Sequence, residues 1–341
     1  MRVLIDRHHH ALFYSLQRLF GDRLGHIVYT PVGHEWWDEG VWRFGEGYGD
    51  DRLARQFLAL DGWTERDFGQ QPGYRTFRTV DGHHPEREIL GVELGALRAT
   101  PSEWGYVVAT VQDNQRGFAK LARELGAKFV LQVGNTNQSV DWGLDPLALV
   151  SSEVPIRGKG IVYHQEFDAE GLFGYADPPA ASLTIRSFVN CFGSTPCARP
   201  FEQMRQCLPG FTLASHGIDG PDGNIETVAD IAALMRGSAF GWHDKVQGDG
   251  FGHVIHAWAA IGRPLIGHAA HYRGLMAEPL WQDGVTCIDL DKHTLGEAAE
   301  MIVDITRDAS RHRAMCEAIR ATFDELVDFD AEAARIAEFL A

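Results

Sequence analysis

A glycine-rich turn that leads into a mostly apolar segment is the clearest chemical feature of this sequence. Residues 248–266 read GDGFGHVIHAWAAIGRPLI. Glycine lets the backbone approach a ligand closely. A helix that begins directly after the turn points free N–H groups and its positive dipole end at that ligand. We therefore expect this turn to bind an anion, most often a phosphate.

Two basic side chains flank the turn and are candidate partners for the phosphate. Lys245 lies a few residues upstream, and Arg263 follows the predicted helix. We favour Lys245 because the turn brings it toward the ligand, whereas Arg263 can instead cap the helix. A solvated surface lysine is the structural alternative for Lys245.

A histidine run, DRHHH at positions 6–10, follows the first apolar segment. Its candidate catalytic residues are Asp6, His8, His9 and His10. A histidine titrates near neutrality and can act as general base, while Asp6 is an alternative base or orients a histidine. A polar turn with one histidine packed inward is the alternative. Adjacent residues do not easily point at one ion, so we predict no metal site.

Further candidate contacts follow other predicted strands. Asn114 and Asn135 can hydrogen-bond sugar hydroxyls or a base edge, although we favour a helix-capping role for Asn114 or its neighbour Asp113. Gly193, Ser194 and His216 follow strands of the second half, where a plain turn is an equally good interpretation.

An aromatic cluster near the N-terminus, which includes Trp36 and Trp37, is a candidate acceptor surface. Aromatic faces stack on sugars and bases. The alternative is that these rings fill a small satellite core.

The elements that must position these residues alternate between short apolar runs and helical patterns. Such alternation predicts parallel sheets covered by helices. We expect two Rossmann-like, doubly wound α/β domains facing a cleft, at 1–176 and 177–325. A C-terminal helix at 326–341 is expected to pack back on the first domain. The polar stretch 62–88 is predicted to be an irregular insertion, and 168–182 is the expected linker.

The amino-acid composition and net charge exclude some classes of function. The chain has 341 residues, of which 45% are hydrophobic, and a formal net charge of −16, which argues against a general nucleic-acid binder. Five scattered cysteines suggest reduced thiols. The beginning of the chain resembles neither a signal peptide nor an anchor, and we expect no membrane span and a cytoplasmic location.

The segment 248–266 resembles the donor-binding region of GT-B glycosyltransferases, whose pattern reads roughly E-G-F-G-x-x-x-x-E-A-x-A-x-G-x-P-V-I. The resemblance is moderately specific over 225–325 and only architectural over 1–180. It implies a sugar transferase that requires no cofactor and binds a nucleotide-diphosphate sugar. The implied donor contacts are Lys245, Asp249, Gly250, Phe251, Gly252, His253 and His256, together with Gly193, Ser194 and His216. Ala257 stands where the family has its ribose-binding glutamate.

Three functions follow from this resemblance and its departures. The first is transfer of a sugar to an acceptor hydroxyl of a saccharide or lipid-linked sugar. The second is a phage-type enzyme that glycosylates a hydroxymethylated DNA base, which requires base flipping. The third is a non-catalytic or epimerase-like sugar-nucleotide binder, favoured by the missing glutamate at Ala257.

Overall fold

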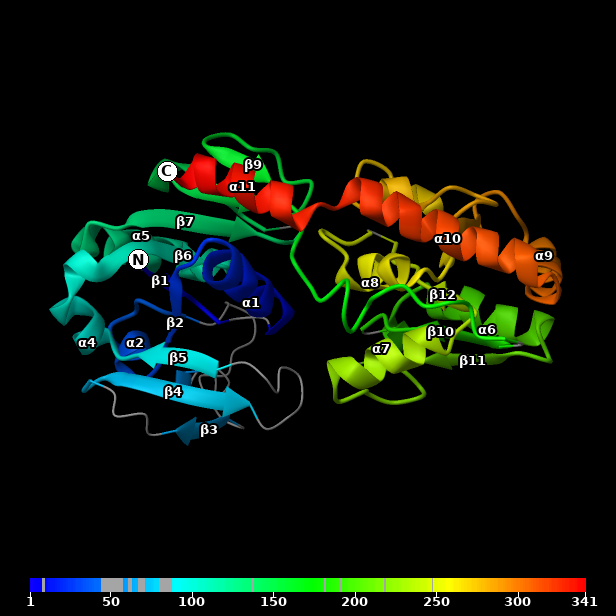
Figure 1. Ribbon diagram of the computed structural model, residues 1–341, viewed down its shortest axis with the longest axis horizontal. Coiled ribbons are helices and arrows are strands. Elements are labelled where there is room, and N and C mark those ends of the chain that lie inside the picture. Colours follow the sequence, from blue (N-terminus) through cyan, green and yellow to red (C-terminus); the bar gives the residue numbers. More distant parts are fainter. Residues whose placement is uncertain are drawn as a thin grey trace. The chain divides into compact units, whose positions relative to one another are not determined.

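The chain forms two compact units in the computed structural model (Figure 1). The structure describes residues 1–7, 10–43, 58–60, 63–66, 71–79, 88–135, 138–180, 182–190, 192–217, 219–246 and 248–341. Unit 1 comprises Met1–Phe167 and Phe329–Ala341, and unit 2 comprises Asp168–Asp328. The linker expected at 168–182 therefore lies within unit 2, and the C-terminal residues group with unit 1.

Unit 1 is built on a nine-stranded sheet in the order β3-β4-β5-β2-β1-β6-β7-β8-β9. Its strands are β1 (Arg2–Ile5), β2 (Ile27–Pro31), β3 (Trp63–Arg66), β4 (Tyr74–Thr79), β5 (Glu88–Val92), β6 (Trp104–Ala109), β7 (Lys128–Val133), β8 (Leu147–Val150) and β9 (Gly160–Val162). All neighbours pair in parallel except β3 with β4 and β4 with β5. The chain runs outward from β1 through β2 and then places β6 on the other side of β1. In such sheets, ligands bind at the strand carboxyl ends where the order reverses.

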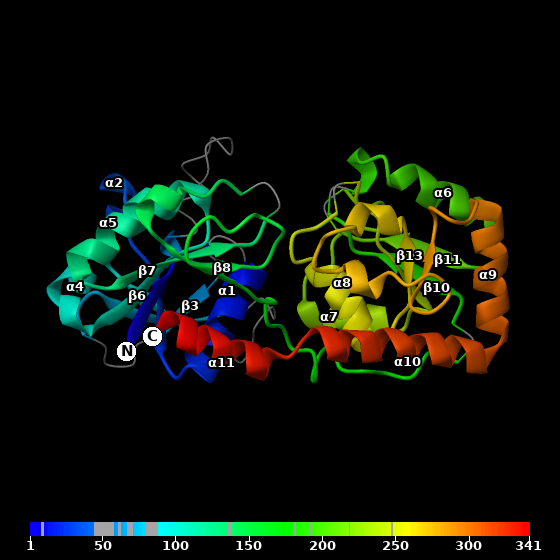
Figure 2. The same cartoon turned by 90° about the horizontal axis from the view of Figure 1, so that it is seen from above.

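Helices cover both faces of this sheet. They are α1 (His10–Gln17), α2 (Glu35–Asp38), α4 (Leu94–Ala99), α5 (Gln115–Leu125) and α11 (Phe329–Leu340). Side chains alternate along β1, so that Leu4 joins the core under α2, α4 and α5, whereas Val3 and Ile5 join the core under α1 and α11. Figure 2 shows α11 beside α1, on the opposite side from α4 and α5.

The stretch 62–88 is not simply an irregular insertion, contrary to the sequence prediction. Its described parts include β3 and β4, which extend the sheet in antiparallel fashion beyond β5. Polar residues in these strands concealed the pattern, since Thr76 and Phe77 are the buried residues of β4 among those whose burial the structure describes. Antiparallel strands tolerate such polarity because one face of the sheet can meet solvent.

Unit 2 has a five-stranded, fully parallel sheet in the order β11-β10-β12-β13-β14. Its strands are β10 (Thr184–Ser187), β11 (Thr212–Ser215), β12 (Phe240–Trp242), β13 (Leu265–Gly267) and β14 (Cys287–Asp289). Its helices are α6 (Ala198–Cys207), α7 (Val228–Arg236), α8 (His253–Ile261), α9 (Leu295–Arg307) and α10 (Ala309–Leu326). The strand order reverses between β10 and β12, which makes the carboxyl end of β12 a natural ligand position.

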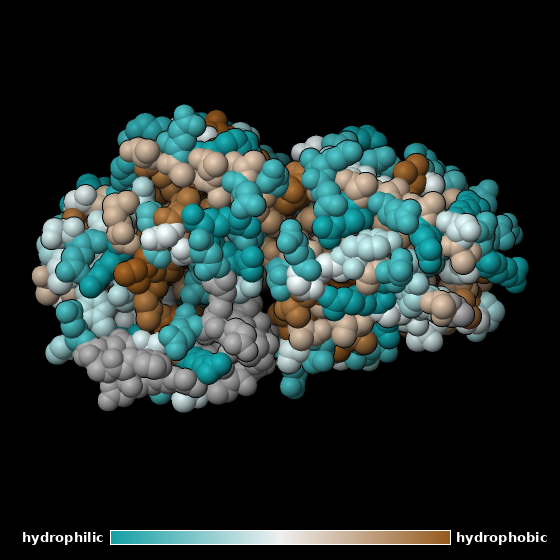
Figure 3. Space-filling model, in the orientation of Figure 1, coloured by the Kyte–Doolittle hydropathy of each residue, from teal (hydrophilic) through white to brown (hydrophobic). Residues whose placement is uncertain are grey.

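Close packing holds α8 against this sheet. Trp258 of α8 is fully buried, and a Cβ added to Gly241 of β12 would lie 2.5 Å from its indole ring. Only glycine fits at that contact, so α8 is fixed directly over β12. On the face shown in Figure 3, hydrophilic side chains cover much of unit 2, with hydrophobic residues scattered among them. Among the described residues, no helix has the length and apolar character needed to cross a membrane.

Candidate functional site

The N-terminus of α8 begins at a glycine cap and is half-buried. Gly252 is the N-cap residue with φ 74°, in the left-handed region that glycine adopts without strain, and its cap lacks a side-chain hydrogen bond. The helix begins at His253, directly after the glycine turn. The first N–H groups of a helix have no intrahelical partner. Gly250, Gly252 and His253 are half-buried, so this backbone lies near the surface at the carboxyl end of β12.

Aromatic packing supports the turn from within. The rings of Phe251 and His256 stack with centroids 4.3 Å apart, and His253 meets Phe251 edge-on at 4.7 Å. Phe251 is 2% exposed, so it can offer a ligand its backbone N–H but not its ring. His256 is fully buried and its Nδ1 lies 3.0 Å from the carbonyl oxygen of Gly252. The prediction that His256 contacts the donor is therefore corrected: its ring braces the turn.

Asp249 ties the turn to β12. Its Oδ2 lies 2.6 Å from Nε2 of His243, and its Oδ1 pairs with Nζ of Lys245. Burial alone would raise the pKa of Asp249, but the hydrogen bond with His243 and the charge of Lys245 hold it well below its ordinary range. The side chain of Lys245 is 36% exposed, so the predicted cation stays accessible at the site.

The loop at residues 243–248, which precedes the turn, is also held by contacts with the segment after β13. The backbone N–H of Lys245 donates to Tyr272 Oη at 3.1 Å, and the ring of Tyr272 stacks on Trp281 at 4.5 Å. Gly248 has φ 63°, and an added Cβ there would lie 2.6 Å from the carbonyl oxygen of His271. The loop is thus held against the segment after β13.

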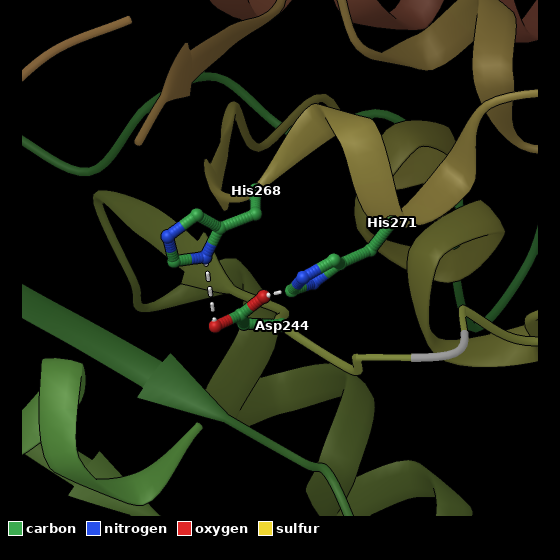
Figure 4. Close-up of side chains that lie close together, drawn as sticks. All are labelled: Asp244, His268 and His271. Atoms are coloured by element: carbon green, nitrogen blue, oxygen red, sulfur yellow. Dashed lines mark hydrogen bonds and ion pairs between the residues drawn. The ribbon is translucent and has the colours of Figure 1, made fainter. Parts of the chain in front are cut away.

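A buried carboxylate with two histidines lies at the same sheet edge (Figure 4). Nδ1 of His268 is 3.1 Å from one oxygen of Asp244, and Nδ1 of His271 is 2.8 Å from the other. Asp244 is 1% exposed, whereas the histidine side chains are about a quarter exposed. The hydrogen bond with Asp244 raises the pKa of His268 against the effect of burial. One ligand atom from each residue lies within 4.8 Å of the others, so the three can hold a metal ion.

The remaining predicted donor contacts follow β10 and β11. Gly193 is exposed in a 3-10 turn, close to the carbonyl oxygen of Asp219, and the side chain of Ser194 is outside the described residues. His216 directly follows β11, is 9% exposed and stacks on Phe188 at 5.4 Å. Among the described residues neither of its ring nitrogens has a hydrogen-bond partner. A ligand that hydrogen-bonds His216 would satisfy that buried ring.

Arg263 caps a helix, as the alternative to phosphate binding predicted. It is fully buried, and its guanidinium donates to the carbonyl oxygens of Ala176, Asp177 and Arg236 as well as to those at the end of α8. It therefore caps α8 and fastens the preceding chain, away from any ligand.

Asp6 directly follows the carboxyl end of β1 in unit 1. It is fully buried, and its two oxygens accept hydrogen bonds from the Thr110 N–H and from Nδ2 of Asn114, both at 2.7 Å. Burial raises its pKa to about 6 although these hydrogen bonds oppose the shift. A base that is fully buried in this way does not reach a substrate, so the prediction that Asp6 is itself the base is corrected. The alternative, that Asp6 orients a histidine of 8–10, stays a prediction because those side chains lie outside the described residues.

Asn114 bridges two segments instead of capping a helix. Its Nδ2 donates to Asp6, and its Oδ1 accepts from the Arg43 N–H at 2.6 Å, with no side-chain bond to the N-terminus of α5. It is fully buried, so its predicted acceptor contact is also corrected. His8 and His9 lie outside the described residues. His10 begins α1, and the structure does not describe its side chain.

The two tryptophans have different environments. Trp36 is fully buried in the core under α2, α4 and α5, and its Nε1 donates to the carbonyl oxygen of Val92 at 3.1 Å. The prediction that it contacts an acceptor is wrong, because the ring completes the main core of unit 1. Trp37 is half-buried against the same core, and Asn135 is exposed in a bend after β7.

Comparisons with solved structures match the whole chain. The structure of Anabaena HepE in complex with UDP and glucose is 16% identical with a TM-score of 0.63, over 100% of this chain and 99% of that chain. An alpha-glucosyltransferase in complex with UDP and a 13-mer DNA is 10% identical with a TM-score of 0.64, over 100% and 99%. Sucrose-phosphate synthase from Thermosynechococcus elongatus is 10% identical with a TM-score of 0.61, over 99% and 98%.

The chain has the GT-B fold. No protein-family model matches the sequence, and no curated protein matches it in sequence. At these low identities, the likeness establishes the GT-B architecture and leaves the chemistry to be argued from the site.

The two acid positions of the family pattern differ in this GT-B chain. Asp249 stands at the first position, and its carboxylate is paired with His243 and Lys245. Ala257 stands at the second position, within α8, and is 5% exposed. Asp244, His268 and His271 were not among the residues predicted from the sequence. The signal was available, because Asp244 follows β12 and the two histidines follow β13, at the same carboxyl edge from which the other candidates were chosen.

Proposed function

We propose that the protein is a glycosyltransferase that moves a sugar from a nucleotide-diphosphate sugar to an acceptor hydroxyl. The observation that carries this proposal is the half-buried N-terminus of α8, with its left-handed Gly252 cap, which follows the carboxyl end of β12. The GT-B fold supports it, as do the matched structures of HepE in complex with UDP, with UDP and glucose, and with UDP-glucose.

The reaction requires a site that stabilises a departing nucleoside diphosphate. Backbone N–H groups of residues 250–253 and the positive end of α8 would bind its phosphate oxygens. Lys245 is the nearest exposed cation on the same loop. These groups are fixed before the donor arrives, because Asp249, Tyr272 and the packed Phe251 ring hold the loop.

The nucleoside part of the donor would lie toward β11. His216 presents a buried ring there whose nitrogens lack partners among the described residues. A base or ribose with hydrogen-bonding edges satisfies such a ring better than an apolar group. This contact would take over part of the recognition that a glutamate at position 257 provides in the family pattern.

A DNA acceptor is the second candidate. One matched structure is described in complex with a 13-mer DNA, which favours it, whereas the net charge of −16 opposes broad binding to phosphate backbones. A hydroxymethylated base in a duplex would be the acceptor in that case. A saccharide or lipid-linked sugar is the alternative acceptor.

Calorimetry and hydrolysis assays test the donor proposal. Purified protein would be titrated with UDP-glucose and with a panel of other nucleotide sugars, and release of free nucleoside diphosphate would be followed. We expect binding and slow hydrolysis of at least one donor. Absence of both for every donor would contradict the proposal, and binding without transfer to saccharide or to hydroxymethylated duplex would favour a sugar-nucleotide binder.

A further inference from the structure

We propose that Asp244, His268 and His271 bind a divalent transition-metal ion at the carboxyl edge of the unit 2 sheet. The three residues come from the ends of two adjacent parallel strands, β12 and β13. Each contributes one ligand atom, and these atoms lie within 4.8 Å of one another. An ion with ligand distances of about 2.0–2.2 Å draws any two ligand atoms to within about 4.4 Å of each other, a little closer than the 4.8 Å limit of the cluster.

The donor set selects the class of metal. Two imidazole nitrogens and one carboxylate suit Zn²⁺, Co²⁺, Ni²⁺ or Fe²⁺, whereas Mg²⁺ and Ca²⁺ prefer sites made of oxygen ligands. The site departs from the sequence-based expectation that the chain holds no metal. That expectation considered only the adjacent histidines at 8–10 and did not consider residues that the fold brings together.

The burial of the three residues leaves an open side for further ligands. Asp244 is 1% exposed and forms the floor, while the histidine side chains are 25% and 24% exposed. A buried carboxylate needs compensating positive charge, which an ion supplies. Three protein ligands with an accessible face are typical of sites where a metal takes an additional oxygen ligand.

The position of the cluster relates it to the donor turn. Asp244 directly precedes Lys245, and Gly248 approaches the carbonyl oxygen of His271 so closely that a Cβ would lie 2.6 Å from it. Resting on the function proposed above, we infer that phosphate oxygens of the donor are the additional ligands. The ion would then share the charge of the leaving diphosphate with the N–H groups at α8.

A second histidine–aspartate pair in unit 2 provides a matched control. Nε2 of His293 lies 3.0 Å from Asp283, and its side chain is 26% exposed, nearly the same as in His271. His293 lies outside the three-residue cluster. Replacing His293 with glutamine therefore removes a comparable hydrogen bond without touching the proposed metal ligands.

Cobalt titration of the full-length, chelator-treated protein tests the site. We expect one equivalent of Co²⁺ to give ligand-field absorption bands, which Zn²⁺ should abolish by competition. In H271Q and H268Q, Co²⁺ affinity should fall by more than the 10–100-fold typical for loss of an outer-sphere partner. H293Q should bind Co²⁺ like the wild type.

Two results would overturn the metal site. One is absence of Co²⁺ bands in wild-type protein whose circular dichroism shows it folded, which would leave the histidines simply hydrogen-bonded to Asp244. The other is equal Co²⁺ affinity in H271Q and H293Q. Titration of UDP with and without Zn²⁺ separates the linked proposals. Metal binding without binding of any nucleotide sugar of the panel would contradict the glycosyltransferase function alone, and UDP affinity unchanged by Zn²⁺ would contradict only the diphosphate contact.

Discussion

Asp249 Oδ2 lies 2.6 Å from Nε2 of His243, and this contact joins the phosphate turn to the end of β12. His243 is almost fully buried, with a side chain 2% exposed, so it has little access to water as an alternative partner. A buried polar group that loses its partner costs about 1–3 kcal/mol.

The variant D249N is therefore expected to lower the free energy of unfolding of unit 2 by about 1–3 kcal/mol. K245M breaks only the more exposed pair and should cost less than about 1 kcal/mol. Urea denaturation followed by circular dichroism measures both. Equal losses in the two variants would show that the His243 contact contributes little.

Gly252 tests the backbone geometry of the turn. Its φ of 74° strains any residue with a Cβ by about 1–2 kcal/mol, so G252A should be less stable and should bind UDP about tenfold more weakly. Gly284 has the same φ of 74° with open space around its Cβ position, far along the chain from the turn. G284A should therefore lose similar stability while keeping its affinity for UDP in calorimetry. If both variants lose UDP affinity equally, the effect of G252A is general and not local to the site.

Asp6 should make stability depend on pH. Its ordinary pKa of 3.8 rises to about 6 in the folded state, because burial disfavours the charged form. Between pH 3.8 and pH 6 the folded chain keeps a proton on Asp6 that the unfolded chain has already released. The stability that this protonated carboxyl contributes is therefore fully present below pH 3.8 and is lost as the pH rises through 6. The loss amounts to about 3 kcal/mol.

The variant D6N, which stays neutral, removes this dependence. The unfolding free energy of the wild type minus that of D6N should fall by about 3 kcal/mol between pH 4 and pH 7. Urea denaturation across this range measures the difference. A difference that does not change with pH would contradict the raised pKa of Asp6.

Variants of Trp36 and Trp37 test whether the first is a core residue and the second lies closer to the surface. W36F removes the hydrogen bond to the Val92 carbonyl and should destabilise unit 1 by about 1–3 kcal/mol. W37F alters a half-buried ring and should cost less than about 0.5 kcal/mol. Chemical denaturation compares them. A larger loss in W37F than in W36F would reverse this assignment.

The sequence predicted the fold wherever hydrophobic periodicity is strong. Buried parallel strands such as Arg2–Ile5 and Lys128–Val133 are short apolar runs of the kind on which the predicted alternation depended. The polar antiparallel strands β3 and β4 were missed, because strands with one face toward solvent do not need a continuous apolar pattern.

The site was predictable only in its backbone part. A glycine turn before a helix is a local pattern, and the glycine-capped N-terminus of α8 follows from it. The roles of Asp6, Asn114 and Trp36 depend on burial by distant segments, which residue type does not reveal. The Asp244 cluster likewise depends on the pairing of β12 with β13, which brings together residues 24 and 27 positions apart.

Backbone amide shifts on UDP addition test the central claim most directly. In protein labelled with ¹⁵N at glycine, phenylalanine and histidine, UDP should shift the amide signals of Gly250, Phe251, Gly252 and His253, and uridine without phosphates should leave them nearly unchanged. Unperturbed signals for all four residues at saturating UDP, or equal shifts with uridine, would contradict diphosphate binding at the N-terminus of α8.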